Sequence, residues 1–279
     1  MLHNKACIQI FWRQYSALAP ASGDSCRQPS AVSHQALAKV PAVTLGFWIV
    51  KILATTLGET GADLFTQQYE MGYLAGIALF TIPLLLLAAV QIASSKFNPL
   101  LYWATILAST TAGTALADYF DRDLGIGYAG GAAILLVCVL GSLALWRSVM
   151  GSIAVQSIST PRAELFYWVT ITFSQTLGTA VGDWAADDGG LGYLGGALVF
   201  GGILLVLALL YWRTALSRVG LFWAAFILTR PLGATVGDFL DKPLAQGGLD
   251  LGRDWATLVL IGAIALALWL LPQRAGAAH

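Results

Sequence analysis

The most constraining feature of the sequence is a mostly apolar segment that occurs four times. The copies begin at Phe47, Tyr102, Tyr167 and Phe222 and align without gaps over their first half. In each copy a Trp is followed by Gly ten residues later and by Asp fifteen residues later, and another Gly stands nine residues after the Asp. The Trp, first Gly and Asp sets are Trp48, Trp103, Trp168 and Trp223; Gly58, Gly113, Gly178 and Gly233; and Asp63, Asp118, Asp183 and Asp238. A repeat at fixed spacing predicts stacked copies of one supersecondary unit.

Composition indicates that these units lie in a membrane. Apolar residues make up 57% of the chain and charged residues only 11%, against about 25% charged residues in a soluble domain. A membrane-spanning helix needs roughly 20 predominantly apolar residues. Eight such stretches are predicted, at approximately 43–64, 72–93, 100–120, 127–146, 165–184, 192–212, 220–240 and 255–271. We therefore expect an all-α integral membrane protein with eight transmembrane helices.

The spans group into four repeats of two helices. Because each repeat crosses the membrane twice, all four copies should share one orientation, as in parallel rather than inverted repetition. Repeats 1 and 2 are expected over residues 43–146 and repeats 3 and 4 over 165–271, joined by a cytoplasmic linker at 147–164. Residues 1–42 are interpreted as a flexible cytoplasmic N-terminal extension, and 272–279 as a C-terminal tail.

This register of Trp, Gly and Asp over roughly residues 43–271 resembles a bacterial inner-membrane family of four tandem two-helix repeats. That family is known as a repeat of unknown function and as "uncharacterised membrane-anchored protein". The resemblance implies eight spans in the inner membrane and implies no particular activity.

Charge distribution predicts the orientation. The termini and the loops after even-numbered spans hold ten bases and two acids, whereas the loops after odd-numbered spans hold three bases and eight acids. Positive loops stay on the cytoplasmic side. Both termini should therefore be cytoplasmic, and the acidic loops should face outward.

Seven ionisable residues fall inside the predicted spans, all on odd-numbered helices. They are Lys51, Glu59, Asp63, Asp118, Asp183, Arg230 and Asp238. A charge facing lipid costs at least about 2.5–3.5 kcal/mol at mid-bilayer. The odd helices should therefore form a polar interior and the apolar even helices an outer layer. Five acids and two bases would leave this interior with a net charge of −3.

A carboxylate cluster with neighbouring hydroxyls points to a hard cation. Aligned helical positions predict a substrate and metal site near the outer mouth from Glu59, Asp63, Asp118, Asp183 and Asp238, with hydroxyls from Thr55, Thr114 and Thr179. Oxygen ligands suit Mn²⁺, Mg²⁺, Ca²⁺ or Na⁺. Lys51 and Arg230 are predicted counter-charges or gating residues. A purely structural role, in which each Asp binds backbone of its own loop, fits the fourfold recurrence equally well.

Three functions remain open on the sequence. The first is a secondary transporter of a small cation, most favourably divalent, with Mn²⁺ preferred and proton exchange as the driving step. The second is a transporter of a small organic solute that uses Arg230 and the repeat-motif aromatics Trp48, Trp103, Trp168 and Trp223. The third is a membrane scaffold or sensor that transports nothing.

Other classes find no support in the sequence. The spans hold no nucleotide loop, zinc motif or cluster of His, Cys and Ser, so we do not expect an enzyme. Balanced charge, with fifteen bases and fifteen acids, gives no sign of a nucleic-acid partner. No covalent cofactor is indicated, and a bound divalent or monovalent cation is the expected small ligand. The expected partner is the lipid bilayer. The four Trp residues are interpreted chiefly as anchors at the membrane interface.

Overall fold

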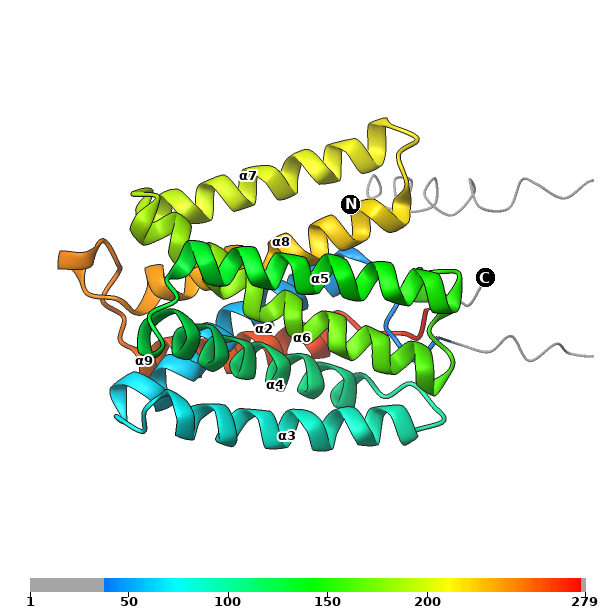
Figure 1. Ribbon diagram of the computed structural model, residues 1–279, viewed down its shortest axis with the longest axis horizontal. Helices are drawn as coiled ribbons and strands as arrows, with labels where there is room; N and C mark the ends of the chain where they lie inside the picture. The colour runs from blue at the N-terminus through cyan, green and yellow to red at the C-terminus, as the bar shows by residue number, and fades with distance from the viewer. Residues whose placement is uncertain (1–37, 277–279) are drawn as a thin grey trace, which may run out of the picture. The chain divides into compact units, whose positions relative to one another are not determined.

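The computed structural model describes residues 38–276, which contain eight long helices and no strand (Figure 1). Most of the predicted extension, residues 1–37, lies outside this range. The helices are α2 (Leu45–Asp63), α3 (Tyr73–Ala93), α4 (Pro99–Asp118), α5 (Tyr128–Met150), α6 (Pro161–Asp183), α7 (Gly192–Arg213), α8 (Arg218–Asp241) and α9 (Arg253–Leu270). Six of them, all except α2 and α6, are long and apolar enough to cross a membrane. The chain thus has the composition of a multi-pass membrane protein.

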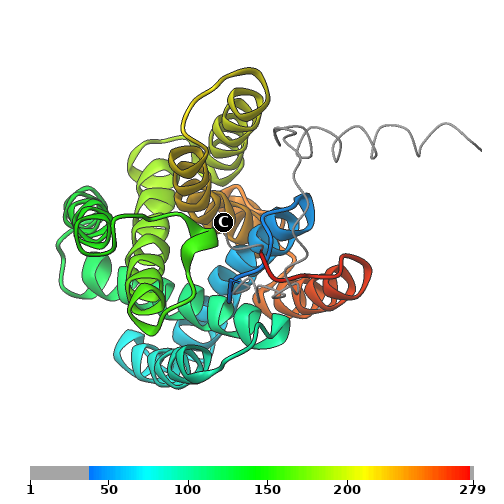
Figure 2. The same ribbon diagram turned by 90° about the vertical axis from the view of Figure 1, so that its right-hand side faces the viewer.

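Helices α2, α4, α6 and α8 form an inner ring, and α3, α5, α7 and α9 surround it (Figure 2). Each inner helix packs against two inner neighbours, in the order α2, α4, α6, α8 and back to α2. In the outer helices only 11–17% of the most apolar window is buried, against 61% in α4 and 44% in α8. The apolar surface of the outer helices is therefore left exposed by the protein itself.

Each outer helix packs mainly on the inner helix of the next repeat. Helix α3 lies on α4, α5 on α6, and α7 on α8, and α9 closes the circle by packing on α2. The two helices of one repeat are therefore held together chiefly through their neighbours. A single repeat would therefore leave its polar helix uncovered, and each of the four copies covers the polar helix of a neighbour.

The sequence specifies where inner and outer helices begin in different ways. Side-chain caps start the inner helices: Thr44, Asn98, Thr160 and Ser217 each accept a hydrogen bond from a backbone N–H of the first turn. Such caps satisfy N–H groups that have no partner within the helix. Three outer helices instead follow a glycine with positive φ, namely Gly72 (+75°), Gly127 (+77°) and Gly252 (+78°).

The first Gly of the motif allows the inner helices to touch. A Cβ atom on Gly58 would overlap Thr110, one on Gly113 would overlap Gln175, and one on Gly178 would overlap Arg230. Gly233 meets Thr55 in the same way. All four contacts join a motif glycine to the same repeat position on the next helix. Small residues permit this close approach of helix backbones.

The two ends of the described chain pair with each other. Ala38 donates a backbone hydrogen bond to Gly276, and Ala42 donates one to Arg274. Lys39 forms a 2.6 Å ion pair with Glu164 at the start of α6. The last residues assigned to the N-terminal extension and the first residues of the C-terminal tail are therefore bound to the bundle.

Candidate functional site

Arg230 marks the point where all four inner helices meet. Its Nη2 atom lies 2.9 Å from Glu59 Oε2 on α2 and 2.6 Å from Thr179 Oγ1 on α6, and it also donates to Thr114 Oγ1 on α4. Arg230 itself lies on α8 and is completely buried. A side chain that reaches the other three helices must lie near the axis of the ring.

Four layers of side chains follow one another along this axis. Residues four apart lie on roughly the same helix face, and the repeat places one residue from each inner helix at each level. From the N-terminal ends of the helices these levels are Lys51, Ile106, Ile171 and Phe226; Thr55, Thr110, Gln175 and Arg230; Glu59, Thr114, Thr179 and Ala234; and Asp63, Asp118, Asp183 and Asp238. All sixteen side chains are buried. The axis therefore becomes more acidic toward the C-terminal ends of the inner helices.

The four motif Asp residues are held in two pairs, each bridged by one base. Lys242 Nζ lies 2.7 Å from Asp63 Oδ2 and 3.2 Å from Asp238 Oδ1. Arg122 lies 3.4 Å from oxygens of both Asp118 and Asp183. We call these groups the lysine pair (Lys242, Asp63, Asp238) and the arginine pair (Arg122, Asp118, Asp183). In both, the base stands four residues after one of its two Asp partners.

The local electrostatics keep Lys242 charged. Burial alone would lower the pKa of Lys242, but the carboxylates of Asp238, Asp63 and Asp241 outweigh burial and raise it above its ordinary value. An opposite charge within hydrogen-bond distance favours the ionised form. Lys242 is therefore an ammonium ion at neutral pH.

A third base closes the same end of the ring. Arg253, the first residue of α9, lies 3.7 Å from Asp63 and 3.4 Å from Asp241, and it donates a hydrogen bond to Gln67 at 2.7 Å. It occupies the helix-start position that Tyr73 and Tyr128 occupy in the first two repeats. From the regular spacing of the motif, the glycine turn before this helix would be expected at Gly247 and Gly248. Because the loop of the fourth repeat is longer, the glycine that precedes α9 is Gly252 instead.

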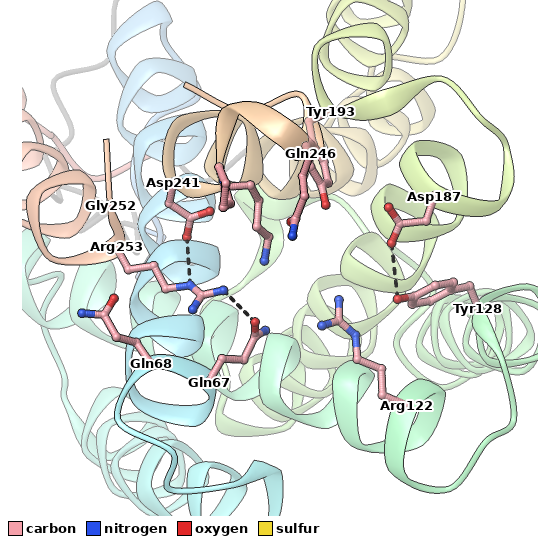
Figure 3. Close-up of a pocket in the computed structure, with 12 residues that line it drawn as sticks. Gln67, Gln68, Arg122, Tyr128, Asp187, Tyr193, Asp241, Gln246, Gly252 and Arg253 are labelled. Carbon is pink, nitrogen blue, oxygen red and sulfur yellow. Dashed lines mark hydrogen bonds and ion pairs between the residues drawn. The ribbon is translucent and has the colours of Figure 1, made fainter. Parts of the chain in front are cut away.

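A pocket of about 560 Å³ opens above the carboxylate layer. Figure 3 shows Arg122, Arg253 and Gln67 on its walls, together with Tyr128 and Asp187. Lys242, Tyr193 and Asp241 also line it. The bases of the pocket wall are thus the same ones that contact the Asp residues below.

Three carboxylates approach closely enough to hold one metal ion. Glu59, Asp63 and Asp238 each offer an oxygen, and these oxygens lie within 4.8 Å of one another. All three residues are at most 4% exposed. An all-oxygen set suits the hard cations expected from the sequence. Asp118 and Asp183 are outside this group and belong to the arginine pair.

The opposite end of the ring is closed by aromatic side chains. The aromatic residue before each motif Trp packs on the Trp of the next repeat, at centroid distances of 5.5, 5.7, 6.2 and 5.8 Å. The pairs are Phe47–Trp103, Tyr102–Trp168, Tyr167–Trp223 and Phe222–Trp48. Trp103, Trp168 and Trp223 are at most 4% exposed. They are therefore packing residues between repeats and do not face lipid as interface anchors would.

Several predicted site residues do not join the carboxylates. Lys51 Nζ lies 4.2 Å from the centroid of the Phe226 ring and finds no hydrogen-bond acceptor among residues 38–276. Thr55 donates its hydroxyl to backbone carbonyls of its own helix and of Thr229 on α8, and its own carbonyl accepts from Arg230. Thr114 and Thr179 accept from Arg230, and only Thr114 also donates to a carboxylate, at 3.5 Å from Glu59 Oε2. The hydroxyls thus surround the guanidinium group more than they extend the cation site.

Reasoning from the sequence missed Arg122, Lys242 and Arg253 because it counted them as loop charges. All three fold back onto buried carboxylates, so the predicted net charge of −3 is largely compensated. The sequence does contain a signal: in repeats 2 and 4 a base follows the motif Asp by four residues, where repeats 1 and 3 have Gln67 and Asp187. Residues four apart on a helix are neighbours.

The family described as "Repeat of Unknown Function (DUF347)" matches the chain four times, over residues 46–97, 101–151, 166–217 and 221–275. The chain belongs to this family. Each DUF347 match begins in an inner helix and extends past the end of the next outer helix. The unit that recurs in DUF347 is thus one polar helix, the turn at the pocket, and one apolar helix. Neither the curated proteins nor the solved structures include a match to the chain.

Proposed function

We propose that this protein is a secondary transporter of a small cation, with divalent ions, Mn²⁺ above all, as the favoured substrate. The observation that supports the proposal most directly is the buried group of Glu59, Asp63 and Asp238 oxygens below an open pocket. Intramembrane ionisable residues are expensive and usually functional. Toward the aromatic end the axis continues through the level of Arg230 and then through a mainly apolar level, in which Lys51 is the single polar side chain.

The membrane arrangement that goes with this function has eight spans. Helices α2 and α6 are less apolar than a typical membrane-spanning helix. Their polar residues are buried and face the inside of the ring. We propose four parallel two-helix repeats with polar helices inside and apolar helices facing lipid. Both termini would be cytoplasmic and the pocket would open outward, in a bacterial inner membrane.

The shape of the ring fits a transport cycle. One end of the axis opens into the pocket, while packed aromatic side chains close the other. A transporter alternates between states open to either side. Proton exchange on the released carboxylates would drive the return step. The two halves of the chain, repeats 1 and 2 and repeats 3 and 4, are the bodies proposed to move.

The organic-solute alternative gains less from the geometry. Arg230 already contacts Glu59, Thr114 and Thr179, and the motif Trp residues are packed against neighbouring repeats. Neither offers a free face to a carboxylate or an apolar group. A scaffold that transports nothing remains the outcome to exclude by experiment.

Cellular metal content, measured by mass spectrometry, tests the proposal. Cells would express the wild type, the Asp63→Asn/Asp238→Asn variant, or Asp188→Asn, which makes the same change at an exposed site. Each culture would be challenged with Mn²⁺, Mg²⁺, Ca²⁺, Co²⁺ and Zn²⁺. We expect one metal to shift with the wild type and Asp188→Asn but not with the double variant at equal membrane expression. If no metal shifts with the wild type although the protein reaches the membrane, divalent-cation transport is wrong, and the organic-solute and scaffold alternatives are the ones to test next.

A further inference from the structure

Lys242 lies where a cation bound by the same carboxylates would lie. Its ammonium nitrogen is within 3.2 Å of oxygens of both Asp63 and Asp238. These two residues, with Glu59, form the three-carboxylate group. A metal ion bound to the three carboxylates would need Asp63 and Asp238 as ligands. It would therefore compete with the Lys242 ammonium for these two residues.

Comparison with the arginine pair shows that a base beside three carboxylates occurs on one side of the ring, where repeats 1 and 4 meet. In the arginine pair Arg122 bridges two Asp residues in the equivalent way, but at 3.4 Å from each. The position equivalent to Glu59 in that half holds Thr179, so no third carboxylate is present. Arginine presents a planar fork of several donors, whereas lysine is a compact point charge on a flexible stem. A point charge is the better substitute for a metal ion.

Lys242 is placed so that its side chain can move from the carboxylates into the pocket. Lys242 is the first residue after α8, is followed by Pro243, and has an extended conformation (φ −72°, ψ 151°). It lines the pocket, whose wall also holds the carboxylates of Asp241 and Asp187. The side chain can thus leave Asp63 and Asp238 toward the pocket and find other anionic partners there. Arg122 and Arg253 line the same pocket, so the total charge of the wall stays mixed.

We propose that Lys242 is a tethered counter-ion: it neutralises Asp63 and Asp238 when no cation is bound and must be displaced into the pocket before the cation binds. This proposal rests on the proposed transport function and names the residue that regulates its site. Displacement keeps the carboxylates compensated in both states, since the ammonium or the cation is always present. It also makes cation affinity depend on a residue that is not itself a ligand.

Chemical labelling of the unmodified protein tests the proposal without a variant. Full-length protein in lipid vesicles would be treated with an amine-reactive reagent, with and without saturating Mn²⁺, and each lysine quantified by mass spectrometry. Lys242 is 7% exposed, whereas Lys96 is exposed and lies far from the pocket residues in sequence. We expect Mn²⁺ to raise the labelling of Lys242 several-fold and to leave Lys96 unchanged. Unchanged labelling of Lys242 while the same vesicles accumulate Mn²⁺ would overturn the tether and leave cation transport standing.

Substitution provides a second test by affinity. In Lys242→Gln the competing ammonium is absent, so we expect the apparent Kd for Mn²⁺ to fall about tenfold, equivalent to about 1.4 kcal/mol. Arg122→Gln, the matched change in the arginine pair, should bring no gain in affinity. Weaker or equal Mn²⁺ binding by a folded Lys242→Gln protein contradicts the proposal. If neither the wild type nor Lys242→Gln binds Mn²⁺ or accumulates any of the five metals, both the tether and the transport function are wrong.

Discussion

The lysine pair and the arginine pair occupy equivalent places in the ring but differ in what they can do. In each pair a base four residues after one Asp also reaches an Asp of the next repeat around the ring. The lysine pair has a third carboxylate, Glu59, and its base is 8% exposed at the side chain. The arginine pair has Thr179 in that place, and its base is 32% exposed.

This comparison shows that the repeat fixes where the side chains lie, whereas residues that differ between repeats decide which charges meet there. The four Asp residues recur because the scaffold recurs, yet only two of them lie beside Glu59. Glu59 in turn is held by Arg230, where the other repeats have Thr55, Thr110 and Gln175. The residues that occur once therefore distinguish one side of a near-symmetric ring, and that side holds the proposed cation site.

The largest expected effect on activity separates the two pairs. Asp63→Asn and Asp238→Asn should each lower Mn²⁺ uptake about tenfold or more, because losing about 1.4 kcal/mol of cation binding is a factor of ten. Asp118→Asn and Asp183→Asn should lower it about threefold or less, because they leave the three-carboxylate group intact. Initial uptake rates in vesicles, normalised to folded protein, provide the measurement. Equal losses in both pairs would remove the functional distinction between them.

The largest expected effect on stability concerns Arg230, which holds Glu59 beside the lysine pair. Arg230→Gln gives α8 the side chain that α6 has at Gln175, and it leaves Glu59 buried without its partner. Breaking a buried ion pair on one side costs about 3–5 kcal/mol, so unfolding in detergent should begin at clearly lower temperature. The paired variant Glu59→Gln/Arg230→Gln should recover most of this loss. A double variant as unstable as Arg230→Gln would show that packing, and not charge, is the cause.

A smaller effect tests the contact that positions Arg230. In Gly178→Ala the new Cβ would overlap the Arg230 side chain and approach Pro231 at 3.0 Å. Overpacking of this kind costs about 1–3 kcal/mol, read as a lower unfolding midpoint. Gly202→Ala on the outer helix α7 is the matched control, since its Cβ meets nothing within 4 Å. Similar midpoints for the two variants would mean that the inner helices can shift apart without cost.

The smallest effect is expected at Asp187, the repeat 3 counterpart of Arg122 and Lys242. Its carboxylate is exposed, and among residues 38–276 its only hydrogen bond is one accepted from the Tyr128 hydroxyl at 3.5 Å. Asp187→Asn should change stability by no more than about 0.5 kcal/mol, as exposed substitutions usually do, and should leave Mn²⁺ uptake near the wild-type rate. A large loss of uptake would place Asp187 in the cation path and enlarge the site beyond the lysine pair.

Helix positions were predictable because long apolar runs and capping residues are local signals. The predicted span 72–93 corresponds to α3, Tyr73–Ala93, and the predicted span 192–212 to α7, Gly192–Arg213. Boundaries differed most around the middle linker, where α5 continues to Met150 and α6 begins at Pro161. The Thr160 cap and Pro161 that start α6 are polar or helix-initiating residues, which an apolar pattern does not detect.

The candidate site was predictable in its carboxylates and not in its bases. Fixed spacing within the repeat places Asp63 and its equivalents at one level, so their common location follows from sequence alone. The ion-pair partners of Asp63 are Lys242 and Arg253, which lie far along the chain. Loop length decides the Arg253 contact, because the fourth repeat starts its outer helix only after Gly252.

The sequence by itself thus determined an all-helical, repeated architecture with acidic residues at one level, because helical periodicity and spacing are local properties. The tertiary structure decided that four inner helices close into a ring, and that each outer helix packs on the next repeat. It also decided that three apparent loop bases neutralise buried carboxylates. These features depend on which helices become neighbours. Neighbours are selected by the packing of glycine against the adjacent helix and by the pairing of buried charges, which join residues distant in the chain.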